Sequence, residues 1–121
     1  MSSNVILALR THLAWRQYNI DDDLVTSTAN AQVAATPIRN AVSRVTVATA
    51  SGSLILPDIL TNVAEDMIWV LNDTAQTINV FPFSAGSING AANTALSLTT
   101  GQAAVFIRDR ANNDWRSAAI S

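Results

Sequence analysis

Short apolar runs, separated by Gly, Pro, Asn and Asp, fill the sequence between residues 53 and 115. Residues 67–71 are apolar throughout, and the run 76–81 follows after a few polar residues. Runs of this length that are rich in β-branched and aromatic residues are typical of β-strands. The connections between them leave no room for crossover helices, which favours antiparallel pairing. The sequence therefore predicts an all-β chain, folded as a small antiparallel β-sandwich or a jelly-roll-like barrel.

The predicted strands follow one another at the spacing that a sandwich or a barrel requires. In chain order they cover residues 44–48, 54–56, 67–71, 76–81, 95–98, 103–108 and 115–120. Residues 72–75 form a connection of hairpin length. Asn89-Gly90 is a strong turn signal, because both residues tolerate a positive φ. The strand 67–71, apolar at every position, is expected to be covered on both faces.

The N-terminal third of the chain has a different character. We assign residues 1–40 to an extended N-terminal arm or attachment segment and residues 41–121 to the β domain. Residues 4–20 fit an amphipathic helix, and two short strands fit them as well. Residues 26–36 are small and polar, which indicates a loop or an extended segment that crosses a neighbouring subunit.

The apolar residues of the arm are the candidates for contact with a partner protein. They are Val5, Ile6, Leu7, Leu9, Leu13, Trp15 and Tyr18. An arm suits this role because it can cover several subunits and become ordered on binding. Deleting residues 1–20 is therefore expected to abolish attachment to the partner while leaving a folded oligomer.

The composition predicts an obligate oligomer. Charged residues make up only 13% of the 121 residues, and hydrophobic residues make up 49%. So few charges cannot cover the surface of a small domain, and much of that surface is expected to meet other chains. The basic residues are all Arg, which suits interfacial ion pairs, although codon usage explains the bias equally well. Cross-strand or intersubunit pairs are expected around one predicted hairpin, among Arg108, Asp109, Arg110, Asp114 and Arg116.

Charge and hydropathy exclude several classes of partner. A net charge of -2 gives no electrostatic reason to bind nucleic acid. The chain has no cysteine, which excludes disulfides, thiol chemistry and thiolate metal sites. No apolar run approaches the length of a membrane span, and the run 5–9 is too short for the core of a signal peptide. The sequence thus predicts a protein that stays in the cytoplasm until it joins its partners.

No arrangement of residues indicates catalysis, a cofactor or a metal. His12 is the single histidine, and no Ser-His-Asp constellation can be assigned to it. Residues 21–23 are three consecutive Asp, which could supply oxygen ligands to calcium but lack the rest of such a loop; a solvated turn or the start of a helix is the favoured interpretation. The glycines of residues 86–90 are followed by no Lys and no helix, so a tight turn is expected there instead of a phosphate loop. We therefore predict a protein that is not an enzyme.

Five aromatic residues lie within or beside the predicted strands. They are Trp69, Phe81, Phe83, Phe106 and Trp115. Together they could form a platform on which a sugar stacks, and ordinary core packing explains them as well.

The order of features along residues 53–115 resembles a module of tailed-phage virion proteins. The features are Leu56-Pro57, an apolar strand ending at Asn72, Val80-Phe81-Pro82, the turn 86–90, Leu96 to Leu98, Gly101 with Val105-Phe106-Ile107, and Trp115. Similar segments occur in capsid decoration (cement) proteins, head fibres and tail-fibre modules. The resemblance implies a β-rich subunit, typically trimeric, and it leaves residues 1–45 without a counterpart.

The resemblance implies one function and one alternative. The short chain favours a capsid decoration protein: a homotrimer on the capsid surface of the virion, assembled in the host cytoplasm, that binds the major capsid protein across capsomers and stabilises the head. The alternative is a tail-fibre or baseplate module that binds a receptor or a glycan. This alternative predicts an exposed aromatic side chain, for which Trp115 is the candidate.

Overall fold

The computed structural model describes residues 20–61 and 66–120, and these residues form an all-β structure. The prediction of an all-β chain is confirmed. The strands are β1 (Ile20–Val25), β2 (Thr36–Pro37), β3 (Val42–Val47), β4 (Ser53–Ile55), β5 (Met67–Asn72), β6 (Ile78–Phe81), β7 (Ser87–Ile88), β8 (Ala91–Ala92), β9 (Leu96–Leu98), β10 (Ala103–Asp109) and β11 (Asp114–Ile120). Two short 3-10 helices, η1 (Gln32–Ala34) and η2 (Arg110–Asn112), lie in the connections.

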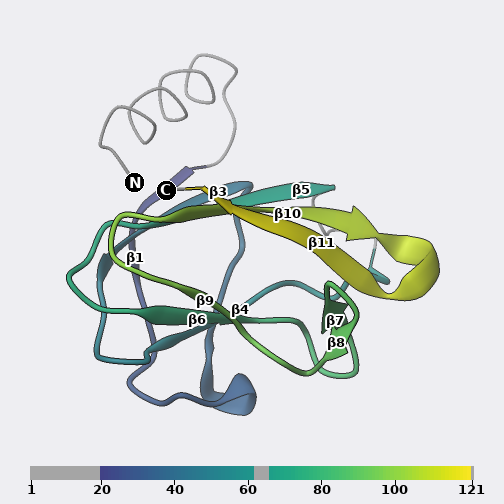
Figure 1. Ribbon diagram of the computed structural model, residues 1–121, viewed down its shortest axis with the longest axis horizontal. Coiled ribbons are helices and arrows are strands. Elements are labelled where there is room, and N and C mark those ends of the chain that lie inside the picture. Colours follow the sequence, from purple (N-terminus) through teal and green to yellow (C-terminus); the bar gives the residue numbers. More distant parts are fainter. Residues whose placement is uncertain (1–19, 62–65, 121) are drawn as a thin grey trace.

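The strands form two sheets that face each other (Figure 1). The seven-stranded sheet has the order β1-β3-β5-β10-β11-β7-β8, and the four-stranded sheet has the order β2-β4-β6-β9. From β1 to β6 the chain alternates between the two sheets, so that each strand pairs in parallel with the strand one full turn earlier. This half of the molecule is wound like a short solenoid.

Most strand pairs in the second half of the chain are antiparallel. β9 pairs with β6, and β10 pairs with both β5 and β11 in antiparallel register. The small β7–β8 hairpin joins the far side of β11 through a parallel contact. The antiparallel strands therefore extend both sheets of the solenoid beyond its last turn (Figure 1).

The prediction of purely antiparallel pairing is wrong for the first six strands. Parallel neighbours need a long crossover, and we expected that crossover to be a helix. Here the link from β1 to β3 contains β2, and the link from β3 to β5 contains β4. Since the crossover is a strand of the opposite sheet, parallel pairing requires no helix. For the same reason residues 72–75 do not close a hairpin: they carry the chain from β5 to β6, which belong to different sheets.

One large hydrophobic core lies between the two sheets. Its bulkiest side chains, among them Phe106, Trp115 and Leu54, are fully buried. A second, smaller cluster consists of Val42, Leu71 and Ala103, all fully buried, with Ile20 and Trp69 packed against them. Side chains alternate between the faces of a strand, so this second cluster lies on the outer face of the seven-stranded sheet. Residues 67–71 thus contribute apolar side chains to both faces of the sheet, as predicted, although Met67 stays half-exposed.

The predicted boundary at residue 40 does not coincide with the edge of the sheets. Residues 20–25 form β1, and residues 36–37 form β2, so both sheets begin inside the segment that we assigned to the arm. Leu24 and Ile38 belong to the core between the sheets. Residues 1–19 lie outside the described part of the chain.

The predicted loop at residues 26–36 lies across its own four-stranded sheet. The Oγ of Ser53 in β4 donates a hydrogen bond of 2.7 Å to the carbonyl of Ala29. The Nδ2 of Asn79 in β6 donates to Oδ1 of Asn30 at 2.9 Å. These bonds satisfy polar side chains of the sheet that the loop buries.

The three consecutive Asp residues do not form a turn, contrary to the favoured interpretation. Residues 21–23 lie in the middle of β1, the edge strand of the seven-stranded sheet. A charged edge strand resists pairing with another chain, and this accounts for an acidic cluster inside a strand. Arg44 of the neighbouring β3 lies 3.6 Å from the carboxylate of Asp22.

The turn predicted at Asn89-Gly90 is confirmed. The register places Ile88 opposite Ala91, which leaves these two residues as the loop of the β7–β8 hairpin. Both have a positive φ, 51° for Asn89 and 83° for Gly90. This is the conformation that a two-residue turn needs to match the twist of its strands.

Candidate binding site

An apolar recess opens between the two sheets, at the C-terminal ends of β2 and β4. Its floor is made of Ile38, Leu56 and Ile68, which are at most 2% exposed. All three belong to the core between the sheets. The volume of the recess is about 370 Å³, within the range of roughly 300–1,000 Å³ that is usual for binding sites. The recess therefore gives access from the surface to the hydrophobic core.

Two prolines line the recess where β2 and β4 end. Pro37 is the last residue of β2, and Pro57 follows Leu56 just beyond β4. Proline has no N–H to donate to a sheet ladder, so neither residue adds a main-chain bond of its own. The main-chain ladder reaches its last bonds here, from Ile38 N to Ile55 O and from Leu56 N to Phe81 O, both 2.9 Å.

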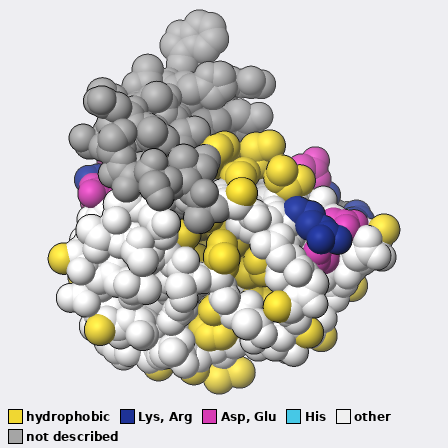
Figure 2. Space-filling view, viewed as in Figure 1, with side chains coloured by type: hydrophobic (Ala, Val, Ile, Leu, Met, Phe, Trp, Pro, Cys, Tyr) yellow, Lys and Arg dark blue, Asp and Glu magenta, His cyan; other side chains and the backbone are white. Residues whose placement is uncertain are grey.

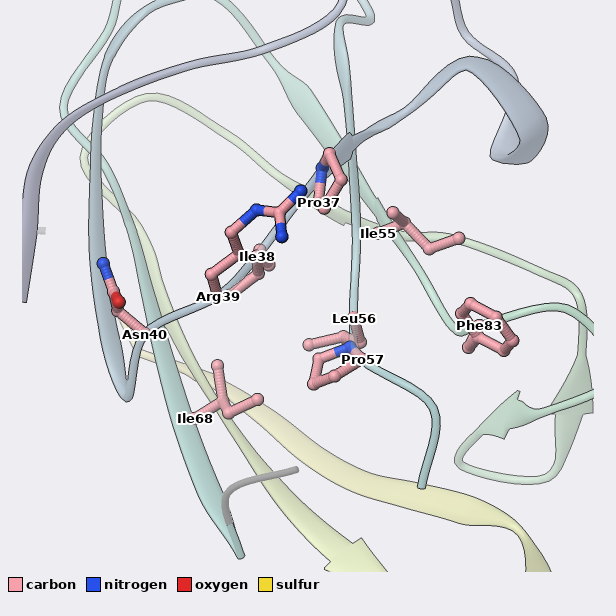
Figure 3. A pocket seen from close by; sticks show the side chains of 9 residues that line it. All are labelled: Pro37, Ile38, Arg39, Asn40, Ile55, Leu56, Pro57, Ile68 and Phe83. Atoms are coloured by element: carbon pink, nitrogen blue, oxygen red, sulfur yellow. The ribbon is translucent and has the colours of Figure 1, made fainter. Parts of the chain in front are cut away.

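The wall of the recess carries an exposed aromatic ring. Phe83 follows β6 and keeps 43% of its surface exposed. Figure 3 shows its ring on the side of the recess where Ile55 lies, facing the two prolines. A half-exposed ring beside buried aliphatic side chains is a suitable contact for another apolar group.

The rim is polar and carries one positive charge. Arg39 and Asn40 lie in the connection from β2 to β3, and Figure 3 shows both extending along one side of the recess. Arg39 is exposed. Within the described part of the chain, its guanidinium forms no ion pair with an acidic side chain.

Most of the other described arginines have acidic partners. Arg44 Nε donates to Asp73 Oδ2 at 3.0 Å, and this hydrogen bond is the main cause that raises the pKa of Arg44. Arg108 Nη2 lies 2.6 Å from Asp66 Oδ1. The Arg44–Asp73 pair lies at the C-terminal end of β5 and the Arg108–Asp66 pair at its N-terminal end. On the face seen in Figure 2, hydrophobic side chains run through the middle and the main group of charged side chains adjoins them on the right.

Of the residues predicted to form ion pairs around the β10–β11 hairpin, Arg116 lies within ion-pair distance of Asp109 and Asp114, whereas Arg108 pairs with Asp66. Arg116 Nε lies 3.0 Å from Oδ2 of Asp114, a carboxylate that is almost fully buried. Burial by itself would raise the pKa of Asp114. Hydrogen bonds from Ser87 and from the N–H of Gly90, with the charge of Arg116, outweigh that effect and hold the pKa below its ordinary value. Asp114 therefore acts as an ionised anchor for the β7–β8 hairpin.

None of these groups forms a catalytic or metal-binding arrangement. Ser87 Oγ donates to Asp114, and the described residues include no histidine that could accept a proton from it. Among the described residues, no three His, Asp or Glu side chains lie close enough together to hold a metal ion. The described part of the chain has no helix with the length and apolar character needed to cross a bilayer.

The residues predicted to contact a partner lie outside the described part of the chain. They are Val5, Ile6, Leu7, Leu9, Leu13, Trp15 and Tyr18, and His12 lies in the same segment. The aromatic platform is corrected: Trp115 and Phe106 are fully buried in the core, so neither can stack on a sugar. Phe83 is the exposed member of the predicted set. The recess is a feature that the sequence did not predict.

The comparisons with known proteins add no relative: no family model, no curated protein and no solved structure matches the chain.

Proposed function

We propose that this protein is a non-enzymatic virion protein of a tailed phage, a capsid decoration protein that oligomerises as a homotrimer and binds the major capsid protein. The proposal begins from the resemblance of residues 53–115 to phage decoration and fibre modules. It assigns to the protein a structural role: burial of apolar surface between neighbouring capsid subunits would hold them together against the pressure of the packaged DNA.

The outer face of the seven-stranded sheet is the observation that supports this proposal best. The outer face of a sheet that meets water is usually polar. Here the neighbouring strands β5 and β10 carry Met67 and Ile107 on it, directly opposite each other in register and each 47% exposed. They lie beside the buried cluster of Val42 and Leu71. An apolar outer face of this kind marks a surface for association.

The described chain begins on the same surface. The chain enters the described structure at Ile20, which lies opposite Val42 and packs against the outer cluster. An attachment segment that ends here would approach the partner from the apolar face. We therefore propose that residues 5–18 and the outer face of the seven-stranded sheet together form the surface that binds the capsid.

Quantitative mass spectrometry of purified virions tests the role. We expect copies of this chain in a near-stoichiometric ratio to the major capsid protein. A few copies for each particle would assign the protein to a vertex fibre or the tail. Absence from virions would contradict any virion role.

Co-sedimentation with capsids that lack the protein tests the surface. The double variant Met67→Glu/Ile107→Lys places opposite charges directly across from each other on β5 and β10, and their attraction should preserve the strand pairing. It removes the apolar side chains that we propose contact the capsid. We expect it to lose capsid binding by at least about tenfold, since two half-exposed side chains leave the interface. The variant Val33→Lys is the matched control, because Val33 on η1 is 96% exposed and lies away from this sheet. Equal binding by both variants would contradict the proposed surface.

A receptor- or glycan-binding module of a tail fibre or baseplate is the second candidate. One observation favours it: Phe83 is an exposed ring beside a recess. Glycan-array binding that Phe83→Ala abolishes, with the melting temperature unchanged, would support this candidate. The same array result with Phe83→Ala unaffected would contradict it.

A further inference from the structure

We infer that the recess is a binding site for a peptide segment of a partner protein, in which an aromatic or branched aliphatic side chain stands next to a carboxylate. The inference depends on the recess alone, so it holds or fails separately from the proposed role in a virion.

The floor of the recess selects an apolar side chain. Ile38, Leu56 and Ile68 offer core side chains that are almost completely shielded, and Phe83 supplies a ring at the wall. A side chain that enters would contact these core side chains directly and lose part of its contact with water. Aromatic and branched side chains gain most from such a pocket, and they are the usual anchors of peptide recognition.

The rim selects a negative charge. Of the described arginines, Arg44, Arg108 and Arg116 lie within ion-pair distance of Asp side chains, and Arg110 donates to the carbonyl of Leu60. Arg39 has neither kind of partner among the described residues, and it is exposed at the mouth of the recess. Its planar fork is suited to bind a carboxylate with two hydrogen bonds.

The surroundings favour a peptide as the occupant. β2 is the edge strand of the four-stranded sheet, and its last residue, Pro37, lines the recess. Asn40 on the rim offers both a donor and an acceptor, which can pair with the main chain of an extended segment. Domains recognise short peptide motifs through a few elements. The recess has three of them beside a strand edge: an apolar pocket, a cation and an amide.

Titration of the ¹⁵N-labelled full chain with two peptides tests the inference. The probes are Ac-Gly-Phe-Asp-Gly-NH2 and its neutral counterpart Ac-Gly-Phe-Asn-Gly-NH2. We expect chemical-shift changes at the recess residues with both, and a dissociation constant about three-fold lower for the Asp peptide, as an exposed ion pair contributes. In Arg39→Gln the two peptides should bind equally. The control Arg110→Gln, which removes the same charge from an exposed arginine outside the recess, should keep the three-fold preference.

Two further measurements separate the parts of the site. Phe83→Ser should weaken both peptides alike, because it removes apolar contact without touching the charge. Absence of shifts at the recess with either peptide would overturn the inference, as would an unchanged preference in Arg39→Gln. Binding of 4-phenylbutyrate without binding of the Asp peptide would overturn the assignment to a peptide and point to a small carboxylate ligand.

Discussion

The buried carboxylate of Asp114 accepts a hydrogen bond of 2.6 Å from the hydroxyl of Ser87, and this bond ties the start of β11 to the β7–β8 hairpin. The N–H of Gly90 donates to the same oxygen at 3.0 Å, so one carboxylate oxygen serves both the first strand of the hairpin and its turn. Main-chain hydrogen bonds from Ser87 N to Asn113 O and from Asn89 N to Trp115 O join the same two segments.

Asp114→Asn should lower the free energy of unfolding by about 1–3 kcal/mol at pH 7, because a charged acceptor is lost from two hydrogen bonds. The pKa of Asp114 is lower in the folded protein than its ordinary value. The carboxylate therefore stabilises the fold above about pH 4, and this contribution is lost as the pH falls below the unfolded value of about 3.9. Urea unfolding at pH 7 and pH 3 measures the difference in the free energy of unfolding between wild type and variant. This difference should be smaller at pH 3.

Asp109→Asn is the matched control for this prediction. Asp109 lies directly opposite Asp114 in the β10–β11 hairpin. Its carboxylate is only partly buried and lies 3.8 Å from Arg116. We expect its effect to stay within about 0.5 kcal/mol. A difference between Asp114→Asn and wild type that stays constant from pH 7 to pH 3 would contradict the role of the ionised form.

Gly52→Ala should destabilise the fold by about 1–3 kcal/mol through overpacking. A Cβ at this position would lie 2.1 Å from Thr26 Oγ1 and 2.8 Å from the main-chain oxygen of Ser27. The link from β1 to β2 would have to shift, since main-chain atoms cannot rotate away. The double variant Gly52→Ala/Thr26→Ala should recover part of the loss, because it removes the closest atom. Thermal melting of the wild type and of both variants measures both effects, and full stability of Gly52→Ala would contradict the close contact.

Local chemistry explains why the strands and turns could be predicted. The strands predicted at residues 44–48 and 54–56 and the Asn89-Gly90 turn each depend on a few adjacent residues, and the structure has a strand or a turn at each of these places. Which sheet a strand joins depends on contacts between distant residues, such as Val42 with Trp69. The residues of an apolar run do not show whether the next strand pairs with it in a hairpin or belongs to the opposite sheet. For this reason the sequence did not predict the parallel pairing.

The candidate site could be predicted only in part, for a similar reason. Pro37 and Pro57 are visible in the sequence, but only the parallel pairing of β2 with β4 brings them to the same edge. Arg39 is one arginine among seven in the sequence. Arg39 differs from most of the other described arginines because no acidic side chain among the described residues pairs with it. Whether an arginine has such a partner depends on where the fold places the acidic residues, which the sequence alone does not show.

Asn72→Asp should be strongly destabilising at neutral pH. Asn72 is fully buried where the chain leaves β5, and its Nδ2 donates to the carbonyls of Gln76 at 2.8 Å and Leu98 at 3.0 Å. A carboxylate at this position would face two acceptors, so we expect a loss of about 1–3 kcal/mol or more. Burial would raise the pKa of the new group, and protonation restores one donor; stability should therefore increase as the pH falls from 7 to 4. Chemical unfolding at both pH values tests this, with Asn40→Asp as the control that should change little.

The acidic residues of β1 should keep the chain from associating through its edge. β1 is the last strand of the seven-stranded sheet, and Asp21 and Asp23 stand on it without an ion pair among the described residues, whereas Asp22 lies near Arg44. Asp21→Thr/Asp23→Thr replaces two charges by residues that favour strands, which removes the repulsion between two such edges.

We expect this variant to associate more strongly than the unsubstituted protein, with an affinity that is roughly three- to ten-fold higher. Sedimentation velocity over a range of concentrations measures the association. Asp66→Thr/Asp109→Thr changes the net charge equally at exposed or partly exposed sites away from β1, and it should sediment like the unsubstituted protein. If the control associates as strongly, the effect belongs to net charge; if neither variant associates, the acidic cluster does not protect the edge.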